Sequence, residues 1–264
     1  AATLPRHQRS IQFDGNERDY EVQVPASYDN SQPVPLVFDI HGYSSNKDQQ
    51  QLVSGIRGKA EDEGFVVVRP NGYGLVSRSW NGGDFCCGDA HAQGLDDVGL
   101  VKAIVTEVSA QVCVDPTRIY ATGISNGGAL SHRLACEAGD VFAAVAPVSY
   151  PLDFTPFSGC QPSRPMPVMH LHGTNDLVVP YGGGLNAPAT PDSFNYWGQV
   201  NGCSGLPTET YTKGSSHCDT YDSCDAGVEV TLCTVNGGHV LYANLDGVPV
   251  DDLAWDFLSR FTLP

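Results

Sequence analysis

The chain has 264 residues, 41% of them hydrophobic and 17% charged, which is enough apolar material for a substantial core. The formal net charge is −16, from 30 acidic residues against 14 Lys and Arg, so the surface repels nucleic acids and anionic membranes. No apolar run reaches the roughly 20 residues of a membrane-spanning helix. We therefore expect no nucleic-acid or membrane partner and a neutral substrate, while the oligomeric state stays open.

After an N-terminal hairpin, the predicted elements alternate between strands and helices. The turn sequence Asp14-Gly15-Asn16 indicates the hairpin. The later strands are continuous apolar runs, whereas the helices show apolar residues at helical spacing. In chain order we predict a hairpin at 11–25, a strand at 34–42, a helix at 49–64, a strand at 65–72, a helix at 95–112 with Asp96 and Asp97 at its N-terminus, a strand at 118–125, a helix at 126–139, strands at 142–149, 166–173 and 228–235, and a helix at 251–261.

These strands predict a mostly parallel sheet in an α/β fold. Strands that are apolar throughout and separated by helices are typical of a parallel sheet with helices on both faces. No repeat, charge block or linker divides the chain, so we expect a single catalytic domain over residues 1–264. Ligands of such sheets bind at the carboxyl ends of the strands. The residues directly after each strand are therefore the candidates for a functional site.

One serine lies between glycines where a strand becomes a helix. The stretch Gly123-Ile124-Ser125-Asn126-Gly127 matches the pattern G-x-S-x-G of a serine nucleophile on a sharp strand-to-helix turn. Small neighbours make room for this turn, and the following helix N-terminus stabilises developing negative charge. A glycine-rich turn with an ordinary N-cap serine is the alternative, and the partners of the serine decide between the two.

A serine hydroxyl needs a base, and the base needs an orienting acid. Asp176 follows the strand at 166–173, and His239 follows the strand at 228–235, which is the chain order expected for this motif. We therefore predict Ser125 as nucleophile, His239 as general base and Asp176 as the orienting carboxylate. Asp153 is the one rival to Asp176. The remaining histidines near these elements are interpreted as packing, core or turn residues, namely His132, His170 and His172.

The same chemistry needs two backbone N–H groups that bind an oxyanion. Asn126 directly follows the nucleophile and is the first predicted donor. Tyr43, in the loop after the strand at 34–42, is the second, and His41 in that loop is then structural. This chemistry requires no cofactor, and the spacing of the cysteines and histidines supports no metal site.

Nine cysteines are many for an intracellular enzyme, which favours disulfides and a secreted protein. The odd count leaves at least one thiol without a partner in the chain. Four cysteines lie in a segment rich in Gly, Ser and Thr between Cys203 and Cys233, and we expect two bridges among them. Their spacing does not define the pairing.

Several motifs together resemble the secreted polyhydroxybutyrate-depolymerase-like esterases, a group that includes the feruloyl and acetylxylan esterases of carbohydrate esterase family one. The motifs are WNGGDFCCGDA, DDVGLVKAIV, CVDPTRIYATGISNGGALSHRLACE, FAAVAPVS, MHLHGTNDLVVPYGGG and GGH, and they cover the chain from about residue 20 to its end. The resemblance implies an α/β-hydrolase fold and cofactor-free hydrolysis of carboxylic esters. It also implies the triad Ser125, Asp176 and His239.

The resemblance implies two further features of the chain. Members with fewer cysteines keep those matching Cys203 and Cys224, which would leave Cys218 and Cys233 as a second bridge. The chain departs from many relatives after the predicted catalytic histidine, where Trp-Pro-Gly is replaced by HVLYAN. Because that loop borders the acyl site, the inference to a particular substrate is weaker there.

We expect an open site, because the short segment between 149 and 167 leaves no room for a large helical lid. Aromatic residues at strand ends offer flat walls for a phenolic acyl group or a sugar ring, and Trp80, Tyr43 and Tyr181 are the candidate substrate contacts. The sequence therefore predicts a feruloyl esterase that acts on plant cell-wall polysaccharides. The alternatives are a depolymerase of polyhydroxybutyrate or other polyesters, an acetylxylan esterase, and a non-catalytic binding module on the same fold.

Overall fold

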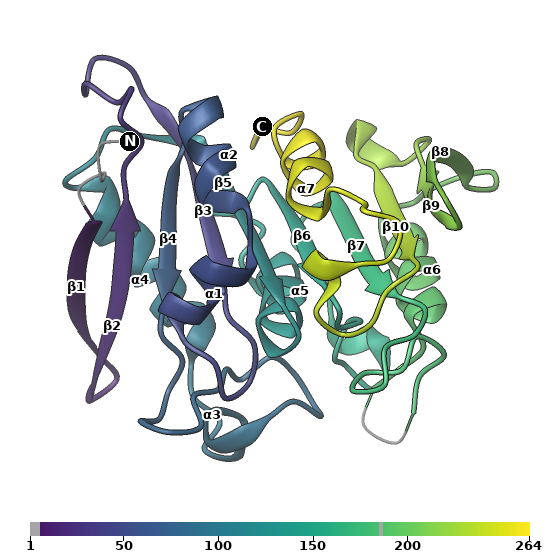
Figure 1. Ribbon diagram of the computed structural model, residues 1–264, viewed down its shortest axis with the longest axis horizontal. Coiled ribbons are helices and arrows are strands. Elements are labelled where there is room, and N and C mark those ends of the chain that lie inside the picture. The colour runs from purple at the N-terminus through teal and green to yellow at the C-terminus, as the bar shows by residue number, and fades with distance from the viewer. Residues whose placement is uncertain (1–5, 185–186) are drawn as a thin grey trace.

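One ten-stranded sheet organises the protein in the computed structural model, which describes residues 6–184 and 187–264 (Figure 1). The strand order is β1-β2-β4-β3-β5-β6-β7-β10-β9-β8. The strands from β4 to β10 in that order run parallel, and the pairs at both edges are antiparallel. The strands are β1 (Arg6–Phe13), β2 (Asn16–Gln23), β3 (Val34–Ile40), β4 (Val66–Pro70), β5 (Val114–Ile124), β6 (Ala144–Val148), β7 (Val168–Gly173), β8 (Thr208–Lys213), β9 (Ser216–Tyr221) and β10 (Val230–Val235).

Helices cover both faces of the sheet, as the sequence predicted (Figure 1). In Figure 1, α1, α2 and α7 lie in front of the sheet and α4, α5 and α6 lie behind it. The helices are α1 (Lys47–Val53), α2 (Ile56–Glu63), α3 (Gly88–Ala92), α4 (Asp97–Ser109), α5 (Asn126–Glu137), α6 (Thr190–Val200) and α7 (Val250–Leu258), with short 3-10 turns η1 (Phe157–Gly159), η2 (Asp225–Gly227) and η3 (Leu241–Ala243).

The two faces bury alternate residues of the same strands. On β3, Leu36, Phe38 and Ile40 point into the core beneath α4, α5 and α6, whereas Val37 joins the core beneath α2 and α7. Successive side chains of a strand point to opposite faces, so a strand covered on both sides must be apolar at every position. This is why the central strands read as continuous apolar runs.

The N-terminal hairpin and the first turn of α4 agree with the sequence prediction. Asp14 and Gly15 both have positive φ values, of 48° and 75°, and they join β1 to β2. The side chain of Asp96 caps α4 by accepting a hydrogen bond from the backbone N–H of Gly99 at 2.7 Å. Asp97 lies in the first turn of α4, as expected, and it is also buried and paired with Arg18.

The buried pair of Arg18 and Asp97 joins β2 to the start of α4. Arg18 Nη2 lies 3.0 Å from Asp97 Oδ1, and the other carboxylate oxygen accepts the backbone N–H of Asn81 at 2.8 Å. Burial raises the pKa of Asp97, and the Arg18 guanidinium opposes that rise. Removal of either partner would leave a buried charge unpaired. The pair therefore holds the loop after β4 against α4.

Two predicted segments differ in the structure. The single helix expected at 49–64 is broken into α1 and α2, because Ser54 Oγ donates to Asp39 and the Gly55 N–H donates to Asp251 at the break. The segment rich in Gly, Ser and Thr between Cys203 and Cys233, where only the strand at 228–235 was predicted, also contains the hairpin of β8 and β9. Helix α6 was not predicted either. Its proline lies in the first turn, where proline is tolerated, and burial of Phe194 and Trp197 offsets the cost of the glycine near its end.

Both predicted cysteine pairings of the Cys203–Cys233 segment are confirmed. Cys203 bonds Cys224, and Cys218 bonds Cys233 across the neighbouring strands β9 and β10. Two further bridges were not predicted: Cys136–Cys160, which ties α5 to the loop after β6, and a bridge between the adjacent residues Cys86 and Cys87. The ninth cysteine is Cys113, which is exposed and forms no disulfide. No helix within the described residues is long and apolar enough to cross a membrane.

We expect the Cys218–Cys233 bridge to contribute to stability and not to chemistry. Replacing both residues by alanine should lower the free energy of unfolding by about 3 kcal/mol, the value for closing a loop of roughly 15 residues. Urea denaturation measures this change, and turnover of a p-nitrophenyl ester should be retained. Cys113→Ser is the matched control, with a change within about 0.5 kcal/mol. A double variant as stable as the parent would contradict the expectation.

Candidate active site

Ser125 occupies a strained turn between β5 and α5. Its backbone angles are φ 58° and ψ −123°, a conformation that costs a non-glycine residue about 1–3 kcal/mol. The turn is held in place because the Ser125 N–H donates to the Val148 carbonyl on β6 and the Ser125 carbonyl accepts from Ala129. The half-buried side chain thus lies at the carboxyl edge of the sheet, above the N-terminus of α5.

The glycines around Ser125 allow β3 and α5 to approach each other closely. A Cβ on Gly127 would lie 2.2 Å from the carbonyl oxygen of Ile40, and a Cβ on Gly123 would lie 2.6 Å from the same oxygen. On the opposite side, a Cβ on Gly42 would lie 3.2 Å from the Cβ of Ser125. The predicted steric role of the glycines is therefore visible in the backbone contacts themselves.

Asp176 and His239 lie on two loops that are joined through their backbones. Asn175 N–H donates to Gly237 O at 3.0 Å, and Thr174 N–H donates to Val235 O at 2.8 Å. A Cβ on Gly173 would lie 2.4 Å from Gly237 O, so glycine is required at the end of β7 for this contact. The loops after β7 and β10 therefore form one unit.

The side chains of Asp176 and His239 are hydrogen-bonded. His239 Nδ1 lies 2.7 Å from Asp176 Oδ2, and Asp176 Oδ1 accepts the backbone N–H groups of Val178 and Val179. Burial by itself would raise the pKa of Asp176, but the nearby His172 ring and the hydrogen bonds from His239 and the Val179 N–H outweigh burial and hold this pKa far below its usual range. Asp176 is therefore ionised, and its carboxylate oxygen can only accept, so His239 Nδ1 is the donor of the hydrogen bond between them.

Ser125 and His239 line the same cleft, which has a volume of about 410 Å³. Its walls come from the loop after β3, from α1 and from the loop after β10. Several apolar side chains on these walls are well exposed: Tyr43, Leu52, Val53 and Val240. The remaining lining residues are Gly42, Ser45, Gln49, Gln50 and Ile124. The cleft is therefore an open, largely apolar depression with a serine and a histidine in it.

The loop that carries Tyr43 is held by the buried His41. The Gly72 N–H donates to His41 Nε2 at 2.9 Å, so the ring proton is on Nδ1, which donates to the Gly42 carbonyl at 2.7 Å. Burial lowers the pKa of His41 to about 4, so the ring is neutral near pH 7. His41 joins the loops after β3 and β4, a structural role that agrees with the sequence interpretation.

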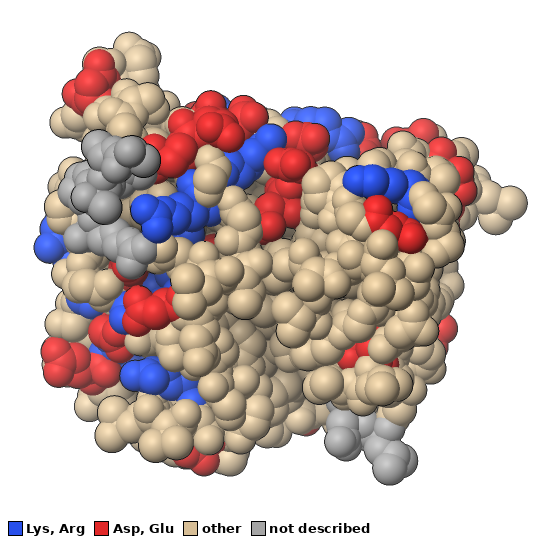
Figure 2. Space-filling view, viewed as in Figure 1, with Lys and Arg blue, Asp and Glu red and all other residues tan. Residues whose placement is uncertain are grey.

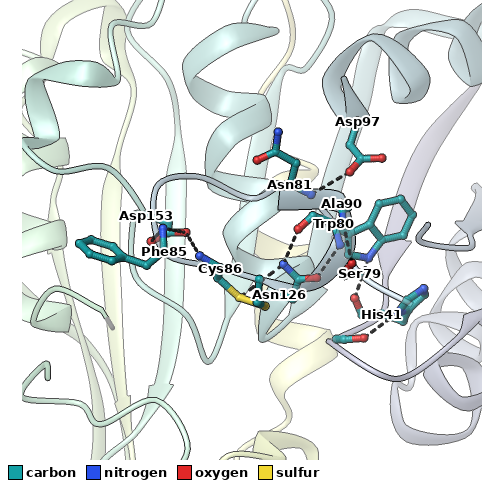
Figure 3. Close-up of a disulfide and its surroundings, with 12 residues drawn as sticks. His41, Ser79, Trp80, Asn81, Phe85, Cys86, Ala90, Asp97, Asn126 and Asp153 are labelled. Carbon is teal, nitrogen blue, oxygen red and sulfur yellow. Dashed lines mark hydrogen bonds between the residues drawn. A yellow bond between two sulfur atoms is a disulfide. The ribbon is translucent and has the colours of Figure 1, made fainter. Parts of the chain in front are cut away.

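A loop containing the Cys86–Cys87 bridge holds the side chain of Asn126 (Figure 3). Trp80 N–H donates to Asn126 Oδ1 at 2.7 Å, Asn126 Nδ2 donates to Trp80 O at 2.9 Å, and Cys86 Sγ lies 3.5 Å from the same nitrogen. The first N–H groups of a helix have no intrahelical acceptor. With its side chain fixed, Asn126 at the start of α5 keeps its backbone N–H beside Ser125.

Asp153, the sequence rival of Asp176, supports this loop. Its carboxylate accepts the backbone N–H groups of Phe85 and Cys86, as Figure 3 shows. Burial raises the pKa of Asp153 to about 6, although the two backbone hydrogen bonds oppose that rise. The carboxylate that meets the histidine ring is that of Asp176.

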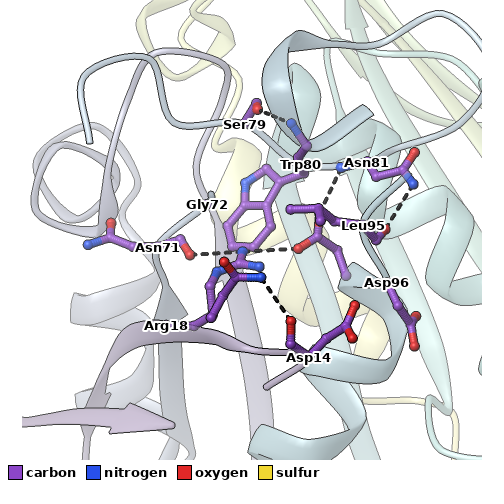
Figure 4. A network of polar contacts seen from close by, with 12 residues as sticks. Asp14, Arg18, Asn71, Gly72, Ser79, Trp80, Asn81, Leu95 and Asp96 are labelled. Carbon is purple, nitrogen blue, oxygen red and sulfur yellow. Dashed lines mark hydrogen bonds and ion pairs between the residues drawn. The ribbon is translucent and has the colours of Figure 1, made fainter. Parts of the chain in front are cut away.

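The structure corrects the role expected for Trp80. Its side chain has no exposed surface, its indole N–H donates to the His41 carbonyl at 2.9 Å, and the guanidinium of Arg18 lies over its ring (Figure 4). A buried ring of this kind supports the loop after β3 and does not contact substrate. Tyr181 is also absent from the described lining of the cleft, and its hydroxyl is hydrogen-bonded to Thr234 at 2.7 Å. Of the three predicted contacts, Tyr43 lines the cleft.

Sequence reasoning missed the contribution of α1 to the cleft. Leu52 and Val53 are exposed there, while Gln50 and Ser54 bond the buried Asp39 of β3. Apolar residues in a short helix normally indicate a core-facing side, so their pattern carries no signal of exposure. The adjacent cysteines Cys86 and Cys87 are a sequence signal that could have identified the disulfide-containing loop beside Asn126.

The surface around the carboxyl ends of the strands carries few charges. Figure 2 shows Asp, Glu, Lys and Arg gathered along the upper edge over α2 and α7 and along the left side over β1 and β2, whereas the lower centre of the same face is mostly uncharged. The charged residues are therefore unevenly distributed over this face, and its lower centre offers a substrate few charged side chains.

The mostly parallel sheet, the helices on both faces and the serine on its strand-to-helix turn define an α/β hydrolase. The family model described as esterase PHB depolymerase matches residues 19–156, just over half of the chain. The chain belongs to this family of esterases, which confirms the predicted resemblance.

Two relatives and one solved structure illustrate the relationship. Feruloyl esterase B of Piromyces equi is 36% identical over 92% of this chain, but the chain spans only 45% of that relative's length. A probable feruloyl esterase C of Aspergillus niger is 30% identical over 92% of this chain and 84% of its own length. The structure of an acetyl xylan esterase from Aspergillus awamori superposes with a TM-score of 0.71 over 97% of this chain and 99% of the other, at 14% identity.

Gly127→Ala tests the close approach of β3 and α5. The added Cβ would meet two carbonyl oxygens at 2.6 Å or less, so the turn must shift. We expect ester hydrolysis to fall by about a hundredfold or more, since a shift of 1 Å at a catalytic group has that effect. Gly58→Ala on α2, where a Cβ meets nothing within 4 Å, is the control and should raise the free energy of unfolding by about 0.5–1 kcal/mol. Parental turnover by the Gly127 variant would refute the steric argument.

Proposed function

We propose that this protein is a serine carboxylic-ester hydrolase that releases hydroxycinnamoyl groups, such as feruloyl groups, from plant cell-wall polysaccharides. Ser125 is the nucleophile, His239 the general base and Asp176 the orienting carboxylate. The observation that carries the proposal is the 2.7 Å contact between His239 Nδ1 and Asp176 Oδ2, with His239 and Ser125 lining one cleft. The neighbouring N–H groups of Tyr43 and Asn126 serve as the oxyanion hole.

The reaction proceeds in two acyl transfers. Ser125 Oγ attacks the ester carbonyl carbon while His239 Nε2 takes the hydroxyl proton, and the carbonyl oxygen becomes an oxyanion held by the two N–H groups. The C–O bond to the alcohol then breaks, and the alcohol leaves with the proton from His239. Water next gives a proton to His239 and attacks the acyl-enzyme, which releases the acid and returns the proton to Ser125. Asp176 stays ionised and stabilises the imidazolium in both steps.

The exposed apolar walls of the cleft support an aromatic acyl group. An acetyl group would cover little of Tyr43, Leu52 and Val240, whereas a phenylpropenoyl group is long enough to bury apolar surface on several of them. Each buried Å² of apolar surface contributes about 25 cal/mol. The names of the two relatives point to the same acyl class.

Two further proposals concern the setting of this reaction. We propose one catalytic domain over residues 1–264, because a single sheet takes strands from β1 at Arg6 to β10 at Val235. We also propose that the protein is secreted, because its four disulfides need an oxidising compartment to form and persist.

Ser125→Ala tests the nucleophile directly. The variant should fold, since Ser125 makes its turn contacts through backbone atoms. It should lose hydrolysis of a p-nitrophenyl ester by a factor on the order of a thousand or more. Retention of half the activity in a folded variant would rule out Ser125 as the nucleophile. Cys113→Ser, with an exposed hydroxyl in place of an exposed thiol, is the control and should keep parental turnover.

A side-by-side assay tests the substrate class. We expect kcat/KM to be highest for methyl ferulate among methyl ferulate, acetylated xylan, a short-chain p-nitrophenyl ester and a polyhydroxybutyrate suspension. If acetate is released from xylan faster than ferulate from methyl ferulate, the protein is an acetylxylan esterase instead. If hydroxybutyrate is released fastest, it is a polyester depolymerase. If none of the four substrates is hydrolysed, the remaining alternative is a non-catalytic binding module.

A further inference from the structure

Three buried histidines lie behind the carboxylate of Asp176. His170 and His172 are on the same face of β7, and His132 on α5 packs against them, with each ring 5.2 Å from the next. All three side chains are at most 2% exposed. Sequence reasoning interpreted them as packing, core or turn residues, but none of these roles explains why an apolar core contains three polar rings whose burial has a cost.

The partners of His172 locate its proton. Its Nε2 lies 2.9 Å from the backbone carbonyl oxygen of Val179, which can only accept, so this nitrogen carries hydrogen. The same Nε2 lies 3.4 Å from Asp176 Oδ2. The N–H therefore lies between two oxygens, one of which belongs to the proposed catalytic carboxylate.

The other ring nitrogen of His172 is held by two further groups. Nδ1 lies 3.1 Å from His170 Nε2 and 3.1 Å from Thr190 Oγ1. Burial holds the pKa of His170 well below its usual range, so His170 is neutral and can donate from Nε2. Two donors on Nδ1 keep the proton of His172 on Nε2, where it faces Asp176.

We propose that His172 is a positioning residue for the reaction, whose Nε2–H is a second imidazole donor to Asp176 Oδ2 and orients that carboxylate toward His239. The inference rests on the proposed triad and deepens it. Backbone N–H groups hold Oδ1, His239 Nδ1 lies 2.7 Å from Oδ2, and His172 Nε2 lies 3.4 Å from the same oxygen, so rotation of the carboxylate would disturb contacts on both oxygens at once.

The proposal predicts a change in pH dependence that a packing role does not. The titratable groups near this carboxylate are His239 and His172, with His170 and Tyr181 against the His172 ring. Loss of the His172 N–H leaves more negative charge on Asp176, which favours the protonated form of His239. The acidic limb of the rate profile should then move to higher pH.

The test compares His172→Phe with His132→Phe. Both replace a buried ring of the cluster, but His132 bonds Trp197 and has no described hydrogen bond to Asp176. In His172→Phe we expect kcat on methyl ferulate to fall about ten- to a hundredfold with little change in KM. The acidic limb should move up by on the order of 0.5 pH unit. His132→Phe should lower thermal stability without moving that limb, and His172→Gln, which retains an N–H donor, should restore part of kcat.

Parental kcat and pH profile in folded His172→Phe would overturn the proposal, as would an equal shift in both variants. Neither result would affect the esterase assignment, which depends on Ser125→Ala. Nitrogen-15 NMR of histidine-labelled parental protein keeps the proposal testable if His172→Phe does not fold. His172 should carry hydrogen on Nε2 near pH 7, and a proton on Nδ1 alone would overturn the proposal.

Discussion

The close approach of the backbone at the end of β3 to the start of α5 is the constraint on which the site depends. At Gly127, α5 lies so near the end of β3 that any side chain there would overlap the carbonyl oxygens of Ile40 and His41. This contact sets the turn at Ser125 and brings the Tyr43 and Asn126 segments to the same point. The strained backbone of Ser125 persists because packing and hydrogen bonds on both sides determine it.

The buried polar groups around this turn make hydrogen bonds to the protein in place of hydrogen bonds to water. His41 is neutral and joins the loops after β3 and β4, while Asn126 is bound through its side chain to the backbone of Trp80. Asp153 holds the backbone beside the Cys86–Cys87 bridge. Each group is paired, so the supporting structure avoids the cost of unsatisfied buried polar atoms and stays fixed during a reaction that moves charge.

The second half of the proposed site depends on the contact between the loops after β7 and β10. Gly173 permits that contact, and backbone hydrogen bonds from Thr174 and Asn175 secure it. The Asp176 carboxylate then meets two imidazole rings, those of His239 and His172. One ring faces the cleft and the other faces the core, so the same carboxylate connects the cleft to the interior of the protein.

The sequence by itself determined the alternating strands and helices, the N-terminal hairpin and the candidate residues at strand ends, because these features follow from local spacing and turn chemistry. Tertiary structure decided the break between α1 and α2, which Asp39 and Asp251 impose from distant parts of the chain. It also decided that Trp80 is buried, that α1 exposes apolar residues to the cleft, and that His172 reaches Asp176. These are contacts between segments far apart in the chain or orientations of side chains, and residue spacing alone carries no information about either.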